Sequence, residues 1–370
     1  MHTLHIDEPF DLEGGGALRQ IDIAYTTIGT LNEAKDNVVW ICHALTGNAD
    51  ASDWWGGLVG TGRLYDPQQY FIVCANNLGS CYGTTGPASV NPETGEVYGG
   101  AFPEITIRDM VRVIQILCRQ LGIERIHTAL GGSQGGQIVQ EWAIMEPDLF
   151  ENIILMATNA VHSPWGIAFN ETQRMAVEAS LALDREHPEA IRRGLEAARA
   201  IAMLSYRSYD SYQATQAEED NGKLDDYRAS SYQRYQGVKF AKRFDLYSYL
   251  RLSKAMDSHH VGRGRGGIDV ALQRIKARTL VIGIDTDLLF PLSEQVTIAN
   301  HVPQARLEMV RSRYGHDGFL VEFETITGII RRFMQEGAFR APGKQYQLSV
   351  RSVQVHERLS NIALPGTERF

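Results

Sequence analysis

Cysteine is scarce in this 370-residue chain, which contains only Cys42, Cys74, Cys81 and Cys118. None of these residues shows Cys-x-x-Cys spacing, and Cys42 and Cys74 fall inside short apolar runs. A disulfide framework is typical of small secreted domains, whereas a chain of this length can bury a sufficient core without cross-links. We therefore expect free thiols in a protein of the reducing cytoplasm.

Long apolar runs are also absent. No stretch approaches the roughly 18–20 apolar residues that a membrane-spanning helix needs. The first eight residues, Met1–Glu8, have neither the basic start nor the apolar segment of a signal peptide. These absences predict a cytoplasmic protein with no membrane partner.

The chain has no excess of positive charge. Lys and Arg number 36 against 44 Asp and Glu, which gives a net charge of −8, and no basic stripe interrupts the pattern. Nucleic-acid binding would leave such a stripe, so we expect a small-molecule substrate instead. The eleven histidines show no His-Glu-x-x-His or comparable spacing, so we expect no catalytic metal.

Short apolar runs alternate with amphipathic helical patterns in the first 160 residues and again near the end. Runs of four to six apolar residues are the length of buried strands, and nearly continuous apolar character is typical of parallel strands covered on both faces. The predicted strands are 38–42, 70–74, 126–130, 153–156, 279–284 and 307–310, with helices near 106–121, 137–145 and 326–334. This alternation predicts a doubly wound α/β sheet.

The middle of the chain differs, because the strand pattern disappears between about Pro164 and His260. Segments 171–183, 188–204 and 247–256 have helical composition and spacing. We expect an α/β core in 1–163, a helical cap in 164–262 and the second part of the core in 263–370. Such a cap would cover the carboxyl edge of the sheet, where these folds bind ligands. From Pro342 we expect a loosely attached tail, in which 348–353 could form one more strand.

The strongest chemical signal is Gly131-Gly-Ser133-Gln-Gly-Gly136, which contains Gly-x-Ser-x-Gly between a predicted strand and a predicted helix. A sharp strand-to-helix turn raises the serine oxygen above the sheet edge, and the small flanking residues allow that turn. The start of the following helix would favour negative charge that develops there. Ser133 is therefore the candidate nucleophile.

A serine nucleophile needs a base, and the base needs an orienting carboxylate. In this strand-turn-helix arrangement the chain order is serine, carboxylate, histidine. His316 follows the predicted strand 307–310, and Asp285 and Asp287 both follow the strand 279–284. Carboxyl ends of neighbouring parallel strands meet at one edge, so these side chains can converge on Ser133. The pattern alone leaves Asp285 and Asp287 open as the carboxylate.

An oxyanion needs two amide donors, and two positions in the chain fit. The first is the amide of Gln134, directly after the nucleophile. The second lies in the loop after strand 38–42, where we select the amide of Leu45. His43 in that loop precedes the serine in the chain, so we expect it to make structural hydrogen bonds.

Two other patterns are interpreted as structural. The segment Gly262–Gly267 matches Gly-x-Gly-x-x-Gly, but it follows a helical stretch and not a strand, which argues against dinucleotide binding. The tyrosine-rich stretch 206–235 contains interleaved acidic residues. We therefore expect it to form the surface of cap helices and not a base-stacking platform.

Taken together, these motifs resemble the homoserine O-acyltransferases of the α/β-hydrolase fold, typified by homoserine O-acetyltransferase. The similarity covers roughly residues 20–335. The matching stretches are His43–Gly47, Asn77–Pro87, Asn91–Gly95, Phe102–Met110, Gly131–Gly136, Ala157–Ala160, Ala198–Arg207, Tyr235–Gly237, Lys239–Asp245, Asp287–Pro291 and Tyr314–Phe319.

The resemblance implies roles that the residues alone do not give. It selects Asp287 as the carboxylate, assigns Arg199 to the substrate α-carboxylate, and places Tyr206 and Asp317 around the amino acid, with Asp317 attracting its ammonium group. It implies acetyl-CoA as co-substrate with no bound cofactor, acetyl transfer to L-homoserine by a ping-pong acyl-serine mechanism, a role in methionine biosynthesis, and a homodimer formed through the cap. One departure is Gln134, where the family commonly has Met; a polar side chain there could alter the acyl pocket.

Three alternatives accompany this prediction. The same scaffold could use succinyl-CoA as donor or serine as acceptor. The same triad could serve an esterase or other hydrolase, whose rate homoserine would not change. A non-catalytic interaction protein is the third, and the intact set of Ser133, Asp287 and His316 argues against it.

Overall fold

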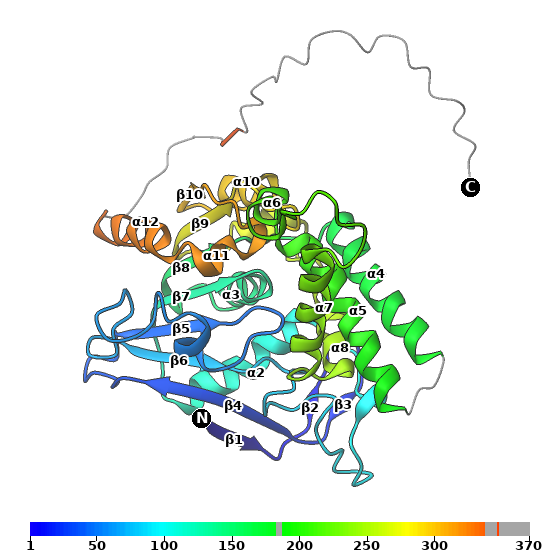
Figure 1. Ribbon diagram of the computed structural model, residues 1–370. Helices are drawn as coiled ribbons and strands as arrows, with labels where there is room; N and C mark the ends of the chain where they lie inside the picture. Colours follow the sequence, from blue (N-terminus) through cyan, green and yellow to red (C-terminus); the bar gives the residue numbers. More distant parts are fainter. Residues whose placement is uncertain (183–186, 337–345, 348–370) are drawn as a thin grey trace.

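The computed structural model describes residues 1–182, 187–336 and 346–347. Within these ranges an eight-stranded sheet has the order β1-β4-β6-β5-β7-β8-β9-β10 (Figure 1). Its strands are β1 (His2–Ile6), β4 (Ile21–Ile28), β5 (Val38–Cys42), β6 (Phe71–Ala75), β7 (Ile126–Gly132), β8 (Phe150–Met156), β9 (Arg278–Ile284) and β10 (Ala305–Val310). A separate antiparallel pair joins β2 (Phe10–Asp11) to β3 (Ala17–Leu18).

The six predicted strands are all present, each within a few residues of its expected bounds. From β6 to β10 every neighbouring pair is parallel, as the continuous apolar runs predicted. The predicted fold class, a mostly parallel doubly wound sheet, is confirmed. The pattern did not reveal β1 and β4, which pair antiparallel with one another, while β4 pairs antiparallel with β6. Partial exposure of both strands explains why no continuous apolar run marked them.

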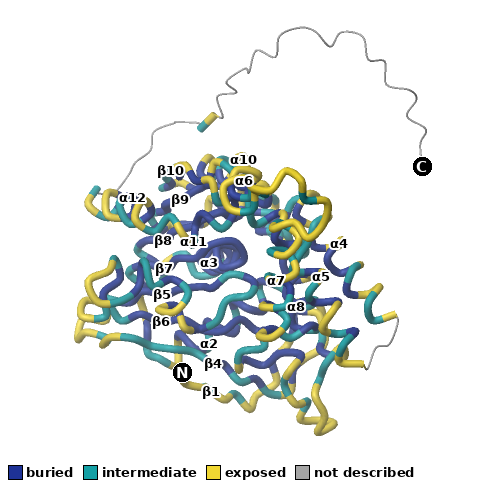
Figure 2. The backbone as a smooth tube through the Cα atoms, in the orientation of Figure 1, coloured by how far each residue is buried: buried dark blue, intermediate teal, exposed yellow. Residues whose placement is uncertain are grey.

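Helices cover both faces of the sheet, and two buried clusters lie beneath them. On one face, α2 (Ile107–Gln120), α3 (Gln134–Met145) and α10 (Leu292–His301) contribute to a core that contains the side chains of Val38 and Trp40. On the other face, α1 (Ala51–Trp54), α11 (Gly318–Val321) and α12 (Phe323–Gln335) pack with Val39 and Ile41. Alternate residues of β5 thus enter opposite clusters, and Figure 2 shows the central strands and α3 buried.

Local signals explain where α2 begins. Thr106 accepts a hydrogen bond from the amide of Asp109, and the Asp109 side chain accepts one from the amide of Thr106 in return. This reciprocal capping satisfies two amides that a helix start leaves without partners. The apolar spacing of residues 111, 114 and 117 then buries one face of the helix, as predicted.

A helical insertion, residues 164–257, separates β8 from β9. It consists of α4 (Pro164–Leu181), α5 (Pro188–Tyr206), α6 (Tyr209–Gln216), α7 (Arg228–Ala241) and α8 (Leu246–Asp257), and Figure 1 shows α4, α5, α7 and α8 gathered at one end of the strands. Three of these were predicted, although α4 starts earlier, where Ser163 caps it before Pro164. A short helix, α9 (Ile268–Leu272), follows the insertion.

Some expectations fall outside the described residues. Leu183, the predicted end of the first insertion helix, lies there, as do Pro342 at the expected start of the tail and the possible strand 348–353. Within the described ranges, no helix combines the length and apolar character that crossing a bilayer requires.

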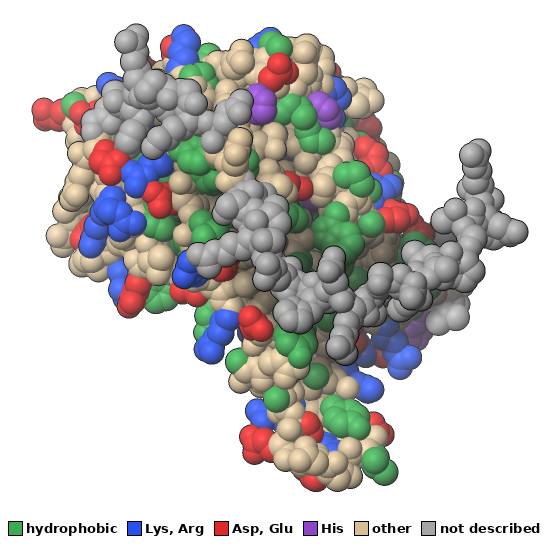
Figure 3. Space-filling model, turned by 90° about the horizontal axis from the view of Figure 1, so that it is seen from above, with side chains coloured by type: hydrophobic (Ala, Val, Ile, Leu, Met, Phe, Trp, Pro, Cys, Tyr) green, Lys and Arg blue, Asp and Glu red, His purple; other side chains and the backbone are tan. Residues whose placement is uncertain are grey.

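The molecular surface carries charges of both signs. On the face shown in Figure 3, Lys and Arg side chains alternate with Asp and Glu and form no continuous basic band. In the Gly262–Gly267 segment, Arg263 pairs with Glu13 and Arg265 pairs with the buried Glu141 of α3. Those ion pairs join the glycine-rich segment to Glu13 and to α3, which gives it a structural role within the core.

Candidate active site

Ser133 occupies a strained turn between β7 and α3. Its backbone has φ 56° and ψ −126°, a conformation that non-glycine residues rarely adopt. The amide of Ser133 donates to the carbonyl oxygen of Met156 at 3.0 Å, and its carbonyl oxygen accepts from Thr158 Oγ1 at 2.8 Å. These bonds hold the turn from the adjacent β8 side.

Close approach of backbone explains a glycine that follows the serine. A Cβ on Gly135 would lie 2.1 Å from the carbonyl oxygen of Cys42, at the end of β5. Only glycine allows α3 to begin so close to this strand. The second glycine of the Gly-x-Ser-x-Gly pattern is therefore explained by packing against β5, and the first, Gly131, by packing against the backbone of Gly135.

His316 and Asp287 form a buried pair at the carboxyl ends of β10 and β9. His316 Nδ1 lies 2.7 Å from Asp287 Oδ2, and the other carboxylate oxygen accepts from the amides of Leu289 and Phe290 at 2.8 and 2.9 Å. The competing carboxylate, Asp285, accepts from the amide of Ser312 instead. The geometry thus pairs Asp287, and not Asp285, with the histidine.

The surroundings of His316 control its protonation. Burial alone would lower its pKa, but attraction to Asp287 and the hydrogen bond between them raise the pKa above the usual value of 6.5. Aromatic rings pack on the imidazole, with the Phe290 centroid at 5.1 Å and the Tyr206 centroid at 5.8 Å. The imidazole is therefore fixed in orientation with its Nε2 edge left for proton transfer.

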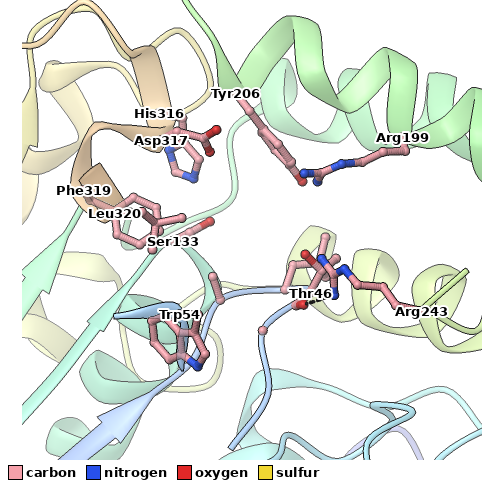
Figure 4. A pocket seen from close by; sticks show the side chains of 13 residues that line it. Thr46, Trp54, Ser133, Arg199, Tyr206, Arg243, His316, Asp317, Phe319 and Leu320 are labelled. Carbon is pink, nitrogen blue, oxygen red and sulfur yellow. Dashed lines mark hydrogen bonds between the residues drawn. The ribbon is translucent and has the colours of Figure 1, made fainter. Parts of the chain in front are cut away.

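Ser133 and His316 both line one cavity of about 210 Å³. Figure 4 shows the Ser133 hydroxyl and the His316 ring facing the same space. In the described ranges no hydrogen bond joins the two side chains, so the arrangement is one in which the hydroxyl and the imidazole still have to approach one another. Looser contacts of this kind are common before substrate binds.

The two amides chosen as oxyanion donors are both free to donate. Leu45 lies in the turn Ala44–Gly47, which the amide of Gly47 closes by donating to the carbonyl oxygen of Ala44 at 2.9 Å. The amide of Gln134 is the first of α3. Neither amide has a hydrogen-bond acceptor among the residues that the structure describes.

His43 makes hydrogen bonds that hold the loop carrying Leu45. It is buried, its Nδ1 lies 2.8 Å from the carbonyl oxygen of Ala44, and its Nε2 accepts from the amide of Asn77 at 3.1 Å. Burial lowers the pKa of His43 to about 4, so the ring is neutral at physiological pH. The expectation that His43 makes structural hydrogen bonds is confirmed.

The side chain of Gln134 points away from the cavity. Its Oε1 accepts from Asn77 Nδ2 at 3.3 Å, and its Nε2 donates to the carbonyl oxygen of Leu252 in α8 at 3.2 Å. The side chain is not part of the cavity wall. Where the family commonly has Met, this chain therefore has an amide that connects the turn to the helical insertion.

Arg199 and Tyr206 face the cavity from α5. The Arg199 guanidinium carbon lies 5.1 Å from the centroid of the Tyr206 ring and 5.2 Å from that of Phe240. No carboxylate pairs with Arg199 in the described ranges, and its buried Nε has no hydrogen-bond partner there. An unpaired guanidinium held between aromatic rings is suited to an anionic ligand.

Asp317 lies beside His316 and already has a cationic neighbour. Its Oδ2 is 3.0 Å from Arg207 Nε, the residue directly after Tyr206. Burial raises the pKa of Asp317 and outweighs the opposing effect of Arg207 and Arg199. An ammonium group entering the cavity would therefore share Asp317 with Arg207, a partner that the sequence analysis did not identify.

Other residues of the cavity wall were missed. Trp54, Thr46, Leu320 and Arg243 all line it, and Figure 4 shows Arg243 extending toward Thr46. Arg243 was noticed only as part of a motif, because an arginine near a helix end is usually a solvated charge. A cluster of three or more metal-binding side chains is not found in the described residues.

Comparison with known proteins identifies the fold and the family of this chain. The family model of the alpha/beta hydrolase fold matches residues 37–323. Homoserine O-acetyltransferase of Cyclobacterium marinum is 49% identical over 332 residues, which cover 90% of this chain and 94% of that protein. This chain belongs to the homoserine O-acetyltransferase family.

Solved structures agree with the family assignment. The crystal structure of homoserine O-acetyltransferase from Bacillus anthracis matches with a TM-score of 0.80 and 25% identity, covering 91% of this chain and 98% of that one. Esterase E22 matches with a TM-score of 0.82 at 24% identity, covering 90% and 99%. The second match shows a shared fold, on which members of this family and esterases are both built.

Proposed function

We propose that this protein transfers an acetyl group from acetyl-CoA to the side-chain hydroxyl of L-homoserine. The observation that carries the proposal is a single cavity lined by Ser133, by His316 paired to Asp287, and by the unpaired Arg199. A nucleophile with its base and a carboxylate-binding cation thus lie within reach of one small ligand. High identity to homoserine O-acetyltransferases over nine-tenths of the chain supports the same reaction.

The first half-reaction forms an acyl-enzyme. His316, oriented by Asp287, takes the proton of the Ser133 hydroxyl as the oxygen attacks the thioester carbonyl carbon. The amides of Leu45 and Gln134 stabilise the tetrahedral oxyanion, a contribution of roughly 3–4 kcal/mol for each donor. The carbon–sulfur bond then breaks, the CoA thiolate takes the proton from His316, and acetyl-Ser133 remains.

In the second half-reaction, His316 again acts as base, and Ser133 is now the leaving group. Arg199 binds the α-carboxylate of homoserine, Asp317 attracts its ammonium group, and Tyr206 packs against the bound molecule. The homoserine hydroxyl gives its proton to His316 and attacks the acetyl carbonyl, and the proton returns to Ser133 as the ester leaves. Each substrate binds in turn, so we expect ping-pong kinetics.

Acetyl transfer to homoserine must be faster than hydrolysis of the acyl-enzyme by water. The helical insertion provides a way to exclude that water. We interpret residues 164–262 as a cap between two parts of the core, 1–163 and 263–370. Arg199 and Tyr206 come from this cap, while Ser133 and His316 come from the core. Binding of homoserine between the two would displace water from the acyl-enzyme.

The choice of acetyl-CoA as donor is supported by the relatives, because proteins that are 49% and 45% identical over about nine-tenths of this chain are homoserine O-acetyltransferases. Trp54, Phe319 and Leu320 also present apolar surface in the cavity that Ser133 lines, which suits an acetyl methyl group. Succinyl-CoA as donor, serine as acceptor and simple hydrolysis are the alternatives that the experiment must separate.

The experiment incubates the protein with acetyl-CoA or succinyl-CoA, each alone and with homoserine or serine. We expect acetyl-CoA alone to add one acetyl group to Ser133, and homoserine to remove it as O-acetylhomoserine, both followed by mass spectrometry. Release of acetate at a rate that homoserine does not change would indicate a hydrolase. Faster transfer from succinyl-CoA or to serine would replace the named substrate and keep the mechanism.

We also propose a homodimer formed through the cap. Several large apolar side chains of the insertion are exposed, among them Trp165, Met175, Leu204 and Tyr235. These side chains come from α4, α5 and α7, so the insertion is the part of the molecule where we place the contact with a partner. A second copy of the chain is the partner that the family resemblance implies.

A further inference from the structure

Arg243 connects the helical insertion to the turn that carries one oxyanion donor. It lies between α7 and α8, and its Nη1 donates to the carbonyl oxygen of Thr46 at 2.9 Å and to the Tyr82 hydroxyl oxygen at 2.7 Å. The Tyr82 hydroxyl in turn donates to the carbonyl oxygen of Arg243 at 2.9 Å. Tyr82 therefore holds Arg243 at two points, and Arg243 holds Thr46.

The contact with Thr46 continues to the oxyanion donor through peptide groups. The carbonyl of Thr46 and the amide of Gly47 belong to one peptide group. That amide donates to the carbonyl oxygen of Ala44 at 2.9 Å, and this carbonyl shares a peptide group with the amide of Leu45. One chain of hydrogen bonds thus leads from the guanidinium to the Leu45 N–H.

A cation at the start of such a chain has a defined effect. It draws electron density from the first carbonyl, which makes the attached N–H a stronger donor, and the effect passes along the next hydrogen bond. In the described ranges Arg243 forms no ion pair, so no carboxylate cancels its charge. The same bonds also fix the orientation of both peptide groups of the turn.

We propose that Arg243 is a positioning residue that orients and polarises the Leu45 amide, and that Tyr82 keeps Arg243 in place. This inference depends on the proposed function, because it concerns the oxyanion formed when Ser133 attacks. Phe240 lies under both Arg243 and Arg199, with the guanidinium carbons 5.2 Å from its ring centroid in each case. The residue proposed to bind the acceptor and the residue proposed to align the oxyanion donor therefore rest on one aromatic ring.

Tyr82 provides the sharpest test, because it holds Arg243 without lining the cavity. Its backbone is anchored separately, since Asn76 Nδ2 donates to its carbonyl oxygen at 2.5 Å, and its ring packs against Phe244. Tyr82→Phe removes the hydroxyl and leaves these contacts. Tyr98→Phe is the matched control, because the Tyr98 ring packs on Phe102 and its hydroxyl has no hydrogen bond in the described residues.

The experiment measures kcat and KM with acetyl-CoA and with p-nitrophenyl acetate for the wild type and the variants Tyr82→Phe, Arg243→Gln, Arg243→Lys and Tyr98→Phe. Loss of a whole oxyanion donor reduces kcat by about 10²–10³, so misalignment of the Leu45 amide should have a smaller effect. We expect kcat to fall about 10-fold in Tyr82→Phe and up to about 100-fold in Arg243→Gln. We expect unchanged KM values, partial rescue by Lys and wild-type kinetics for Tyr98→Phe. Inhibition by methylboronic acid, whose tetrahedral serine adduct occupies the oxyanion site, should weaken by the same factors.

Two results would overturn the inference. Arg243→Gln could raise the KM for acetyl-CoA alone, with normal kcat and normal p-nitrophenyl acetate turnover, which would make Arg243 a contact for the CoA part of the donor. Alternatively, Tyr82→Phe could match Tyr98→Phe in every rate and in boronate inhibition. If wild-type Ser133 becomes acetylated but the variants behave like the wild type, only the role of Arg243 is refuted. A wild type that never acetylates Ser133 refutes the proposed function with it.

Discussion

At the scale of single residues, the chemistry depends on pairs that the chain order alone could not settle. Asp285 and Asp287 are two residues apart and follow the same strand, so the residue pattern left both open. The family resemblance pointed to Asp287, and the contact of Asp287 with His316 agrees with that choice. Ser133 was predictable, because a strand, a glycine-rich turn and a helix surround it in the sequence. Arg207 and Arg243 were not, because their partners, Asp317 and Thr46, are more than one hundred residues away.

Replacing Arg199 should separate acceptor binding from acylation. Loss of a charge-assisted hydrogen-bond donor costs roughly 2–3 kcal/mol, so Arg199→Gln should raise the KM for homoserine about 30- to 150-fold. Acetylation of Ser133 by acetyl-CoA alone should be unchanged. Arg193→Gln, an exposed arginine of the same helix that pairs with Glu189, is the control. Equal loss of acylation in Arg199→Gln would contradict the assignment of this residue to the acceptor.

The pH dependence follows from the pKa of His316. The base acts only when neutral, and Asp287 raises its pKa above 6.5, so kcat/KM should fall as the pH drops through a value above 6.5. In Asp287→Asn the attraction is lost and burial remains. The acidic limb should then move to lower pH, and kcat should fall by on the order of 10³–10⁴.

Glu294 is the control for this profile. Burial raises the pKa of Glu294 to about 7, and the charge of Asp287 adds to that shift, so Glu294 also titrates in this range. Glu294→Gln should leave the acidic limb in place if His316 is responsible. A limb that disappears in Glu294→Gln and persists in Asp287→Asn would reassign the titration.

At the scale of elements, the sequence was most informative where burial was complete. Strands β5, β7, β8 and β9 are buried on both faces and appear as continuous apolar runs, whereas β1 and β4 are partly exposed and were missed. Helices α6 and α7 were expected only as cap surface, because their buried residues are few. Sequence patterns thus predicted the sheet centre and most of the helices around it, while the edges needed the three-dimensional pairing.

The junction of β7, α3 and β5 makes its own prediction. Gly135→Ala would place a methyl group 2.1 Å from the carbonyl oxygen of Cys42, and backbone cannot yield as a flexible side chain does. Overpacking of this kind costs about 1–3 kcal/mol, and the displacement of α3 should also lower kcat. Chemical denaturation of Gly135→Ala and of the exposed-site control Gly222→Ala measures the effect. Equal stability of the two variants would contradict the packing argument.

At the scale of the whole molecule, the functional residues come from both halves of the core and from the insertion between them. Arg199 and Arg243 belong to the insertion, and Ser133, Asp287 and His316 belong to the core on either side of it. Local sequence could locate each piece, but the cavity exists only when the sheet edge and α5 meet. For that reason the roles proposed for Arg199 and Tyr206 came from the resemblance to a known family, and the role proposed for Arg243 came from the structure.

The proposed homodimer can be tested at the same scale. Light scattering coupled to size-exclusion chromatography should give twice the mass of the 41.3 kDa chain. Replacing exposed apolar groups of the insertion, as in Met175→Glu with Leu204→Glu, should shift the protein toward the monomer. A monomeric wild type at micromolar concentration would contradict the dimer without affecting the chemistry at Ser133.

In the proposed mechanism, Ser133 carries the acetyl group between the two substrates. Mass spectrometry of the intact protein and its peptides after brief exposure to acetyl-CoA tests this most directly. We expect one acetyl group on Ser133, its loss on addition of homoserine with O-acetylhomoserine as product, and neither event in Ser133→Ala. Undiminished production of O-acetylhomoserine by Ser133→Ala would contradict it.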